Sequence, residues 1–349
     1  MNVYATENIR NVVLLGHGGC GKTSLIESMA FTTGIIKRVR TVAEGGTVSD
    51  YDKEEIKRKF SIQSSVIPLE VDNVKVNLLD TPGLFDFSGE VYEALSVADA
   101  AVIVINGKSG VEVGTRRSFD FCAKKGIPVI VYITCVEDEH VDASAIVDEL
   151  RESYGNKIVP FHMPMKEDGV FKGFINAVKM LECRLQPNGS YDEVVVEEGV
   201  NDELDDYRMQ LMEGVAETSE DLMEKFFAEE PFTEEEIKNA IIGSVARRDL
   251  MPVICGAINT DYGANILLND MVKYFSAPGM VTDQFTGTKV KTGEPVTASY
   301  DASQPVSAYV FKTIADTFVG PFSQVKVTDG ILKPDTAIYN GCLLYTSPS

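Results

Sequence analysis

The sequence predicts an α/β fold built on a doubly wound, mostly parallel sheet with helices on both faces. Short apolar runs alternate with segments of helical periodicity over residues 1–156, and again after residue 250. The runs are continuously apolar, which is typical of parallel strands that are covered on both faces. The first of them leads directly into a glycine-rich loop and a helix, so we expect a ligand site at the carboxyl ends of the strands.

The glycine-rich loop, residues 16–23, reads Gly-His-Gly-Gly-Cys-Gly-Lys-Thr and matches the phosphate-loop pattern G-x-x-x-x-G-K-[ST]. The apolar run Asn11–Leu15 predicts the strand before it, and apolar residues at helical spacing predict a helix over Lys22–Phe31. Glycines let several backbone N–H groups face one point, and the start of the helix adds the positive end of its dipole. The loop is therefore expected to bind phosphate groups; the alternative is a glycine-rich turn without a ligand.

The same pattern assigns individual roles in the loop. Lys22 can reach the β- and γ-phosphates of a nucleotide, and the Thr23 hydroxyl can bind Mg²⁺. The residues that we expect at the nucleotide phosphates are Gly16, His17, Gly18, Gly19, Cys20, Gly21, Lys22, Thr23 and Ser24.

A second motif, Asp-Thr-Pro-Gly at residues 80–83, follows a predicted strand pair at Ser64–Val71 and Val74–Leu79. An acidic residue at the end of a strand that follows a phosphate loop completes the magnesium shell, and Asp80 has this place. Thr-Pro-Gly directly after it is typical of GTPases, in which the N–H of Gly83 senses the γ-phosphate. Alone, the aspartate could belong to a simple turn. Together with the phosphate loop, it indicates a nucleotide site.

Composition and charge exclude several classes of protein. The chain is 44% hydrophobic and 24% charged, no apolar run approaches membrane-spanning length, and the N-terminus lacks a signal-peptide pattern. Six cysteines are scattered without C-x-x-C pairs, which suits a reducing compartment and argues against disulfides or zinc. A net charge of −21 makes the chain a poor general binder of nucleic acid. We therefore expect a cytoplasmic protein that binds neither membrane nor specific nucleic-acid sequences.

Further α/β units complete the expected sheet. Continuous apolar runs predict central strands at Ala100–Ile105 and Val129–Ile133, with helices over Thr115–Lys125 and Val141–Tyr154. A strand and a helix over Met251–Phe275 add one more unit. The segment Gly34–Phe60 between the first helix and the strand pair is polar, lacks a clean strand pattern, and is expected to be functional or mobile.

An insertion interrupts the alternation of strands and helices. Strand-like pieces at Val159–Pro164 and Val170–Val178 precede acidic helices, one of which starts at the capping box Thr233-x-x-Glu236. From Asp192 to Glu236 there are 18 acidic residues and two basic ones, a net charge of −16. These acids are either solvated helix faces or a docking surface.

The expected domains follow from these boundaries. A nucleotide-binding domain in two parts encloses the acidic α+β insertion, and a Gly- and Pro-rich linker leads to strand-rich sequence that begins a truncated β-barrel. In order along the chain, the parts are 1–156, 157–250 (the insertion), 251–277, 278–304 (the linker) and 305–349.

These motifs together resemble elongation factor G, the translocation GTPase of the ribosome. The likeness includes the phosphate loop, Asp-Thr-Pro-Gly with Asp86-Phe87 after it, Leu-Met-Glu-Lys-Phe at 222–226, Pro-Val-Ile-Cys-Gly at 252–256 and Val-Phe-Lys-Thr-Ile-Ala-Asp-Thr-Phe-Val-Gly at 310–320. The resemblance implies a P-loop GTPase domain with GTP and Mg²⁺ as cofactors and the ribosome as partner, with the acidic insertion at the ribosomal stalk. The family has five domains, so the chain looks like an N-terminal part, and its tail after Gly341 departs from the family.

Two departures concern hydrolysis and the metal. The family has His directly after Asp-Thr-Pro-Gly, positioned to orient the attacking water, whereas this chain has Leu84, which cannot form a hydrogen bond. Loss of a group that orients the attacking water typically lowers the rate of hydrolysis by about 10²- to 10⁴-fold. We therefore assign no catalytic residue. Ser61 takes the place of the family's magnesium-binding threonine, which makes Thr23, Ser61 and Asp80 the implied metal ligands. The loop also has Gly19 where the family usually has Asp.

The base-recognition motif departs as well. The family's Asn-Lys-x-Asp is Thr134-Cys135-Val136-Glu137 in this chain, and its later Ser-Ala is Ala257-Ile258. Compared with the family's aspartate, Glu137 places its carboxylate one methylene further out. Asp138 could supply the carboxylate in its place. Cys135 cannot replace the family's lysine. Thr134, Glu137 and Ala257 are thus the implied base-site residues, with weakened guanine preference.

Two other functions stay open on the sequence. One is a nucleotide-gated ribosome-binding or ribosomal protection factor with weak hydrolysis, which the replacement of the family's histidine by Leu84 favours. The other is a P-loop ATPase of metabolism, because the phosphate loop alone does not specify the base.

Overall fold

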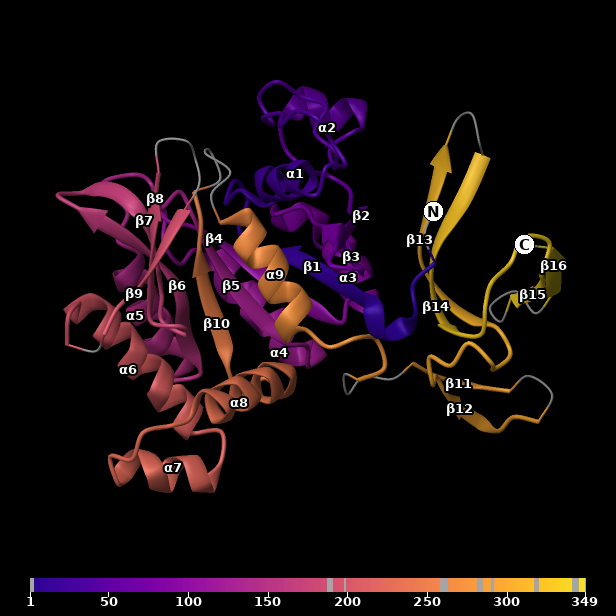
Figure 1. Ribbon diagram of the computed structural model, residues 1–349. Helices are drawn as coiled ribbons and strands as arrows, with labels where there is room; N and C mark the ends of the chain where they lie inside the picture. The colour runs from indigo at the N-terminus through magenta and orange to yellow at the C-terminus, as the bar shows by residue number, and fades with distance from the viewer. Residues whose placement is uncertain are drawn as a thin grey trace.

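The fold is dominated by a ten-stranded mixed sheet flanked by helices, with smaller strand pairs at the C-terminal end (Figure 1). It is seen in a computed structural model that describes residues 3–186, 191–197, 199–257, 263–280, 285–289, 292–316, 320–340 and 345–348. The strands of the large sheet are β1 (Ile9–Leu15), β2 (Ser65–Val71), β3 (Val74–Asp80), β4 (Ala100–Asn106), β5 (Val129–Thr134), β6 (Ile158–Glu167), β7 (Val170–Asn176), β8 (Leu181–Leu185), β9 (Tyr191–Val195) and β10 (Met251–Cys255).

The centre of the sheet is parallel and buried. The strand order is β2-β3-β1-β4-β5-β10-β6-β7-β8-β9, and all pairs from β3 through β6 run parallel. Every residue of β5 and all but the last of β4 are buried, so both faces are covered, as the continuous apolar runs predict. The helices are α1 (Lys22–Thr32), α2 (Lys53–Arg58), α3 (Ser88–Val97), α4 (Val113–Lys125), α5 (Ala143–Tyr154), α6 (Asp202–Ala216), α7 (Glu220–Phe227), α8 (Glu234–Arg247) and α9 (Ala264–Tyr274).

The predicted strand pair forms one edge of this sheet. β2 is an edge strand that pairs with β3 alone, in antiparallel direction. Pro68, which has no backbone N–H to donate, is tolerated at such an edge. Asp72 and Asn73 turn the chain in the left-handed region, with φ of 47° and 63°. Short polar side chains tolerate this conformation, so the predicted hairpin is confirmed.

The segment predicted as an insertion extends the same sheet. β6 pairs in parallel with β10, and β7, β8 and β9 follow in antiparallel order. The sequence predicted two strands, but the structure has four here. The mostly exposed β9 carries no apolar run to mark it, and β8 has only five residues. The acidic stretch runs from β9 through α6 and α7 into the first turn of α8, which starts at the predicted capping box of Thr233 and Glu236. The boundaries of the insertion as a domain stay a prediction.

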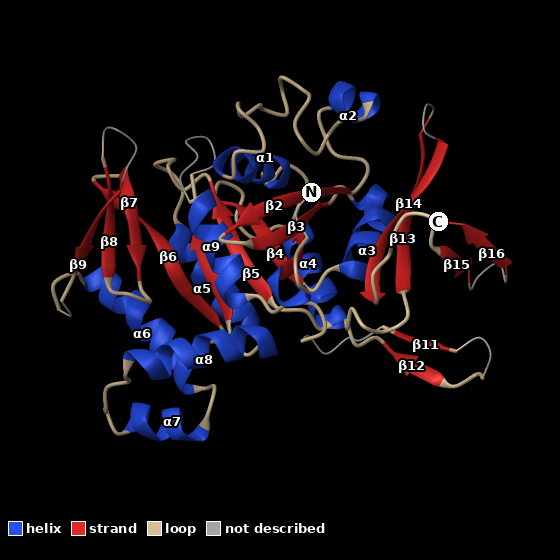
Figure 2. Cartoon of the chain, turned by 45° about the vertical axis from the view of Figure 1, so that its right-hand side comes forward, coloured by secondary structure: helices blue, strands red, loops and turns tan. Residues whose placement is uncertain are grey.

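Small strand pairs follow the large sheet and lie beside it (Figure 2). The segment expected to be a linker contains a short hairpin. The sequence did not predict it, because its three-residue strands are exposed and show no apolar pattern. The strand-rich character of the C-terminal part is confirmed. In the part of the chain that the structure describes, no helix has the length and apolar character needed to cross a membrane. These strands are β11 (Thr286–Thr288), β12 (Pro295–Thr297), β13 (Ser307–Asp316), β14 (Gly320–Asp329), β15 (Ala337–Asn340) and β16 (Tyr345–Pro348).

Candidate nucleotide-binding site

The glycine-rich loop connects the carboxyl end of β1 to the first turn of α1. Gly21 precedes the helix with φ of 103°, a conformation that glycine adopts without strain. The buried Lys22 folds back over the loop, and its Nζ donates to the carbonyls of Gly16 and His17 at 3.1 and 3.0 Å. The ammonium group therefore lies across the loop whose N–H groups would face phosphate oxygens.

The Asp-Thr-Pro-Gly loop touches the phosphate loop through its glycine. A Cβ atom on Gly83 would lie 2.7 Å from the backbone N and Cα of Gly18 and from the carbonyl oxygen of His17. Gly83 is therefore required for this close backbone approach. The two sequence motifs thus meet in space, although α1, α2 and the strand pair of β2 and β3 lie between them in the chain.

Three predicted metal ligands converge at the start of α1. The Thr23 hydroxyl donates to Oδ2 of Asp80 at 3.0 Å and lies 3.2 Å from Oγ of Ser61. Oδ1 of Asp80 is buried and has no hydrogen-bond partner among the described residues. Burial raises the pKa of the Asp80 carboxyl above its usual value, and a cation beside it would favour the ionised form. A carboxylate and hydroxyl oxygens are donors that suit Mg²⁺, so the residues present fit this metal.

A cleft of about 350 Å³ opens beside these groups. It contains Asp50, which the sequence analysis missed because the charge-rich segment around it gives no pattern that singles out one carboxylate. Burial, reinforced by the carboxylates of Asp80 and Glu55, raises the pKa of Asp50 to about 6. The lining residues are Gly18, Gly19, Gly21, Lys22, Thr23, Ser24, Val42, Asp50, Lys59, Phe60, Ser61, Gly83 and Leu84.

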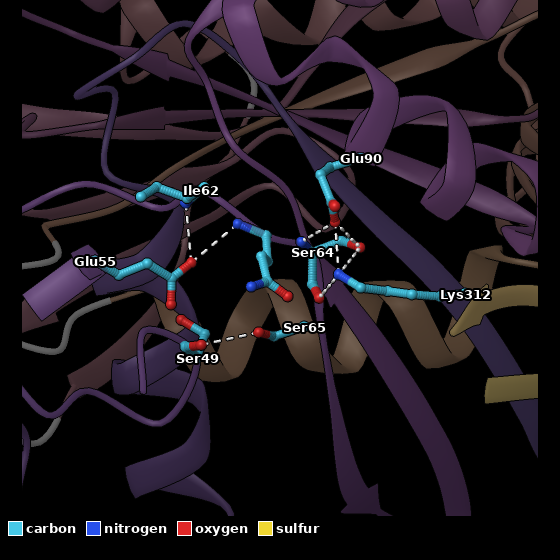
Figure 3. A network of polar contacts seen from close by, with 8 residues as sticks. Ser49, Glu55, Ile62, Ser64, Ser65, Glu90 and Lys312 are labelled. Atoms are coloured by element: carbon cyan, nitrogen blue, oxygen red, sulfur yellow. Dashed lines mark hydrogen bonds and ion pairs between the residues drawn. The ribbon is translucent and has the colours of Figure 1, made fainter. Parts of the chain in front are cut away.

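Buried carboxylates hold the segment that we expected to be functional or mobile. Both oxygens of Glu27 accept backbone N–H groups, from Arg40 at 3.1 Å and Val48 at 2.8 Å. Glu55, which lies on α2, accepts the N–H groups of Ile62 and Gln63 at 2.9 and 3.0 Å (Figure 3). Each glutamate is 2% exposed, so these bonds satisfy charges that burial would otherwise destabilise. Glu55 thereby holds the chain directly after Ser61.

Leu84 occupies the place expected from the sequence. Its Cδ2 would lie 3.1 Å from a Cβ built on Gly18, so the side chain lies against the phosphate loop. It lines both the large cleft and a smaller cavity of about 30 Å³ that Phe85 also lines. The imidazole of His17 lies nearby, with its Nε2 3.4 Å from Oε1 of Glu112 and its ring edge toward Phe85. Leu84 thus lies between a cleft with polar and charged lining and a small cavity that it shares with Phe85, and it is 38% exposed.

The expected base-site residues lie elsewhere than the large cleft, whose lining includes none of them among the described residues. Thr134 is fully buried behind the phosphate loop, where its hydroxyl contacts the Cys20 carbonyl at 3.1 Å and the Ile105 carbonyl at 3.3 Å. This geometry supports a role in holding the loop. Asp138 forms an ion pair of 2.5 Å with Lys108, whose ammonium lowers the pKa of the carboxyl.

The remaining base-site predictions are placed only in part. Glu137 is half-buried in the loop after β5, and Ala257 is buried after β10. Ile258 lies outside the described residues. The roles of these residues in base recognition therefore stay predictions.

Comparison with known proteins identifies the family of the chain. Residues 7–277 match the family described as the elongation factor Tu GTP binding domain. The chain belongs to this family. The crystal structure of a protein from Thermus thermophilus is similar, with a TM-score of 0.82 and 30% sequence identity over 98% of this chain. The match covers 48% of that protein, so the chain spans about half of its length. The predicted fold, a P-loop GTPase sheet followed by the start of a β-barrel, is confirmed.

The position of Thr134 leads to a test of how the phosphate loop is held. Thr134→Val keeps the shape of the side chain but removes the hydroxyl contacts to Cys20 and Ile105. We expect the free energy of unfolding to fall by about 1–3 kcal/mol, because buried carbonyls lose a donor. Denaturant titration measures this loss. Thr134→Ser, which keeps the hydroxyl, should lose less; an equal loss in both variants would contradict the role of the hydrogen bonds.

Proposed function

We propose that this chain binds GTP with Mg²⁺ and hydrolyses it, as the GTPase part of a translation factor that resembles elongation factor G. Coupling of hydrolysis to ribosomal translocation is part of the proposal. The observation that carries it is the convergence of Thr23, Asp80 and Ser61 beside the Lys22 ammonium group. Membership in the family of the elongation factor Tu GTP binding domain supports the choice of nucleotide.

Each part of the site has a distinct task in this proposal. The N–H groups of the glycine-rich loop hold the phosphates, and the Lys22 ammonium exchanges its carbonyl partners for phosphate oxygens. Thr23, Ser61 and Asp80 hold Mg²⁺, which when bound neutralises charge on the β- and γ-phosphate oxygens. Gly83 places its N–H beside the phosphate loop, where the γ-phosphate would lie.

A specific observation favours a second candidate function. The side chain of Leu84 lies against the phosphate loop where the related elongation factors have a water-orienting His, and it can neither donate nor accept a hydrogen bond. Binding and hydrolysis therefore depend on different residues. A nucleotide-gated ribosome-binding or ribosomal protection factor with weak hydrolysis is consistent with this arrangement.

The partner proposal concerns the acidic insertion. Its helices α6, α7 and α8 lie at the end of the sheet away from the C-terminal strands (Figure 1). We propose that this insertion contacts the ribosomal stalk, as the corresponding subdomain does in elongation factor G. The ribosome is the partner of the chain in both candidate functions.

The first prediction concerns phosphate binding. Lys22→Met removes the ammonium group while keeping a long side chain. We expect the affinity for Mg²⁺-GTP to fall about 10- to 100-fold, because a hydrogen bond to a charged group contributes about 1.5–3 kcal/mol. Equilibrium titration measures the dissociation constant. Lys57→Met, in a lysine whose side chain is 77% exposed, is the control and should bind normally. Normal binding by the Lys22 variant would refute the assigned phosphate site.

The second prediction separates hydrolysis from binding. Leu84→His should raise the single-turnover hydrolysis rate by about 10²- to 10⁴-fold, because it restores a group that can orient water. The affinity for GTP should stay unchanged, since backbone N–H groups and Lys22 hold the phosphates. Leu84→Met is the control for side-chain volume. An unchanged rate in the His variant, measured with and without ribosomes, would contradict the assignment of this position.

The third prediction concerns the base. In competition with Mg²⁺ present, GTP should displace ATP, and Glu137→Asp should increase that preference about tenfold by shortening the carboxylate to the family's length. Glu139→Asp, on an exposed neighbour, is the control. If ATP binds far more tightly than GTP, the GTPase proposal fails and an ATPase function takes its place.

A further inference from the structure

Two buried lysines link the C-terminal hairpin of β13 and β14 to the GTPase domain. Lys312 lies on β13 and Lys326 on β14, and their side chains are only 5% and 9% exposed. Each ends in an ion pair with a carboxylate of the GTPase domain, Glu90 for Lys312 and Asp99 for Lys326. The two contacts use the same chemistry but reach different parts of that domain.

Lys312 reaches a compact network of polar groups. Its Nζ donates to the carbonyl oxygen of Ser64 at 2.9 Å, to Oγ of Ser64 at 3.1 Å and to Oε2 of Glu90 at 2.5 Å (Figure 3). The same Glu90 oxygen accepts the backbone N–H of Ser64 at 2.7 Å and its hydroxyl at 2.9 Å. One ammonium and one carboxylate oxygen therefore fix both the backbone and the side chain of Ser64.

This network joins the two segments that form the nucleotide site. Ser64 follows Ser61 by three residues, and Glu55 fixes the intervening N–H groups. Glu90 lies in the first turn of α3, seven residues after Gly83. Lys312 thus contacts the chain three residues after Ser61 and, through Glu90, the first turn of the helix that follows Gly83.

The charges of the network depend on one another. Burial by itself would raise the pKa of the Glu90 carboxyl, but Lys312 and the Ser64 N–H hold it below its usual value. Removal of the lysine would leave this carboxylate without its cation in partly buried surroundings, where an unpaired charge is strongly destabilising. The seating of the hairpin and the position of Ser64 are therefore coupled.

Lys326 makes its contacts at the amino end of β4, a central strand of the sheet. Its Nζ donates to the Val97 carbonyl at 2.9 Å and to Oδ1 of Asp99 at 2.6 Å. Asp99 directly precedes the amino end of β4, whereas a parallel sheet binds its ligand at the carboxyl ends. This contact attaches the hairpin without touching a segment of the nucleotide site.

We propose that Lys312 is a positioning residue through which the β13–β14 hairpin and the nucleotide site control each other. This inference rests on the proposed function. In the structure Ser61 contacts Thr23 and Gly83 contacts Gly18 while Lys312 is engaged, an arrangement in which both segments would meet a γ-phosphate. An engaged Lys312 therefore favours a magnesium-bound nucleoside triphosphate over a diphosphate. By thermodynamic linkage, the triphosphate in turn favours the seated hairpin.

The test compares matched variants of the whole chain. Lys312→Met and Lys326→Met each remove one buried ammonium from the hairpin, and equilibrium titration with Mg²⁺ measures their affinities for a non-hydrolysable GTP analogue and for GDP. We expect Lys312→Met to lower the ratio of triphosphate to diphosphate affinity at least about fivefold, the lower end of typical coupling between sites. Lys326→Met should keep the parent's ratio, even where it lowers the melting temperature.

A second pair of variants covers the case in which a lysine variant does not fold. Glu90→Gln weakens the Lys312 contact with little change in shape, and Asp99→Asn does the same to the Lys326 contact. The ratio of triphosphate to diphosphate affinity should fall in Glu90→Gln and keep the parent's value in Asp99→Asn. Amide hydrogen exchange in residues 307–316 supplies the reciprocal measurement. In the parent chain, the triphosphate analogue should slow this exchange more than GDP does. In Glu90→Gln, the two nucleotides should slow the exchange equally.

The outcomes distinguish the inference from the function on which it rests. Equal affinity ratios in the Lys312 and Lys326 variants, or in the Glu90 and Asp99 variants, would show a merely structural contact and overturn the inference while the GTPase function stands. A parent chain that binds neither nucleotide would overturn both. A fall in the ratio confined to the Lys312 or Glu90 variant supports the inference.

Discussion

The hydrogen bond between the Thr23 hydroxyl and Asp80 is the interaction on which the rest of the site depends. It joins the first turn of α1 to the end of β3, and Ser61 approaches the same hydroxyl from a third segment. Each of these groups alone has an ordinary explanation, as a helix start, a turn aspartate or a surface serine. Their convergence next to a buried carboxylate oxygen that lacks a partner among the described residues gives the site its specific chemistry.

Three glutamates, of which Glu27 and Glu55 are buried and Glu90 is partly buried, organise the chain around this point. Glu27, Glu55 and Glu90 each accept backbone N–H groups from the polar segment between α1 and β2. Burial of a carboxylate is unfavourable unless hydrogen bonds or a cation satisfy it, so each glutamate favours the arrangement in which its partners are in place. Glu90 also pairs with a cation from the C-terminal hairpin, which makes it the point where nucleotide site and hairpin meet.

The glycine-rich loop is held in place by contacts from two other segments of the chain. The phosphate loop is supported from behind by Thr134, and its contact with Gly83 requires only backbone atoms. The backbone contact of Gly83 does not require a particular residue after it, whereas the support from behind comes from Thr134, the first residue of the altered base motif. The chain keeps the fold of its family while it carries Leu84 after Gly83 and Thr134-Cys135-Val136-Glu137 after β5.

The sequence by itself determined the parallel sheet, the phosphate loop and Asp80 at the end of its strand, because apolar periodicity and glycine patterns act over a few neighbouring residues. Only the tertiary structure decided that β8 and β9 extend the sheet, that Asp50 lines the cleft and that Thr134 lies behind the loop. It also decided that Lys312 meets Ser64, 248 residues away. Contacts at such separation depend on how distant segments pack, and local patterns carry no record of that packing.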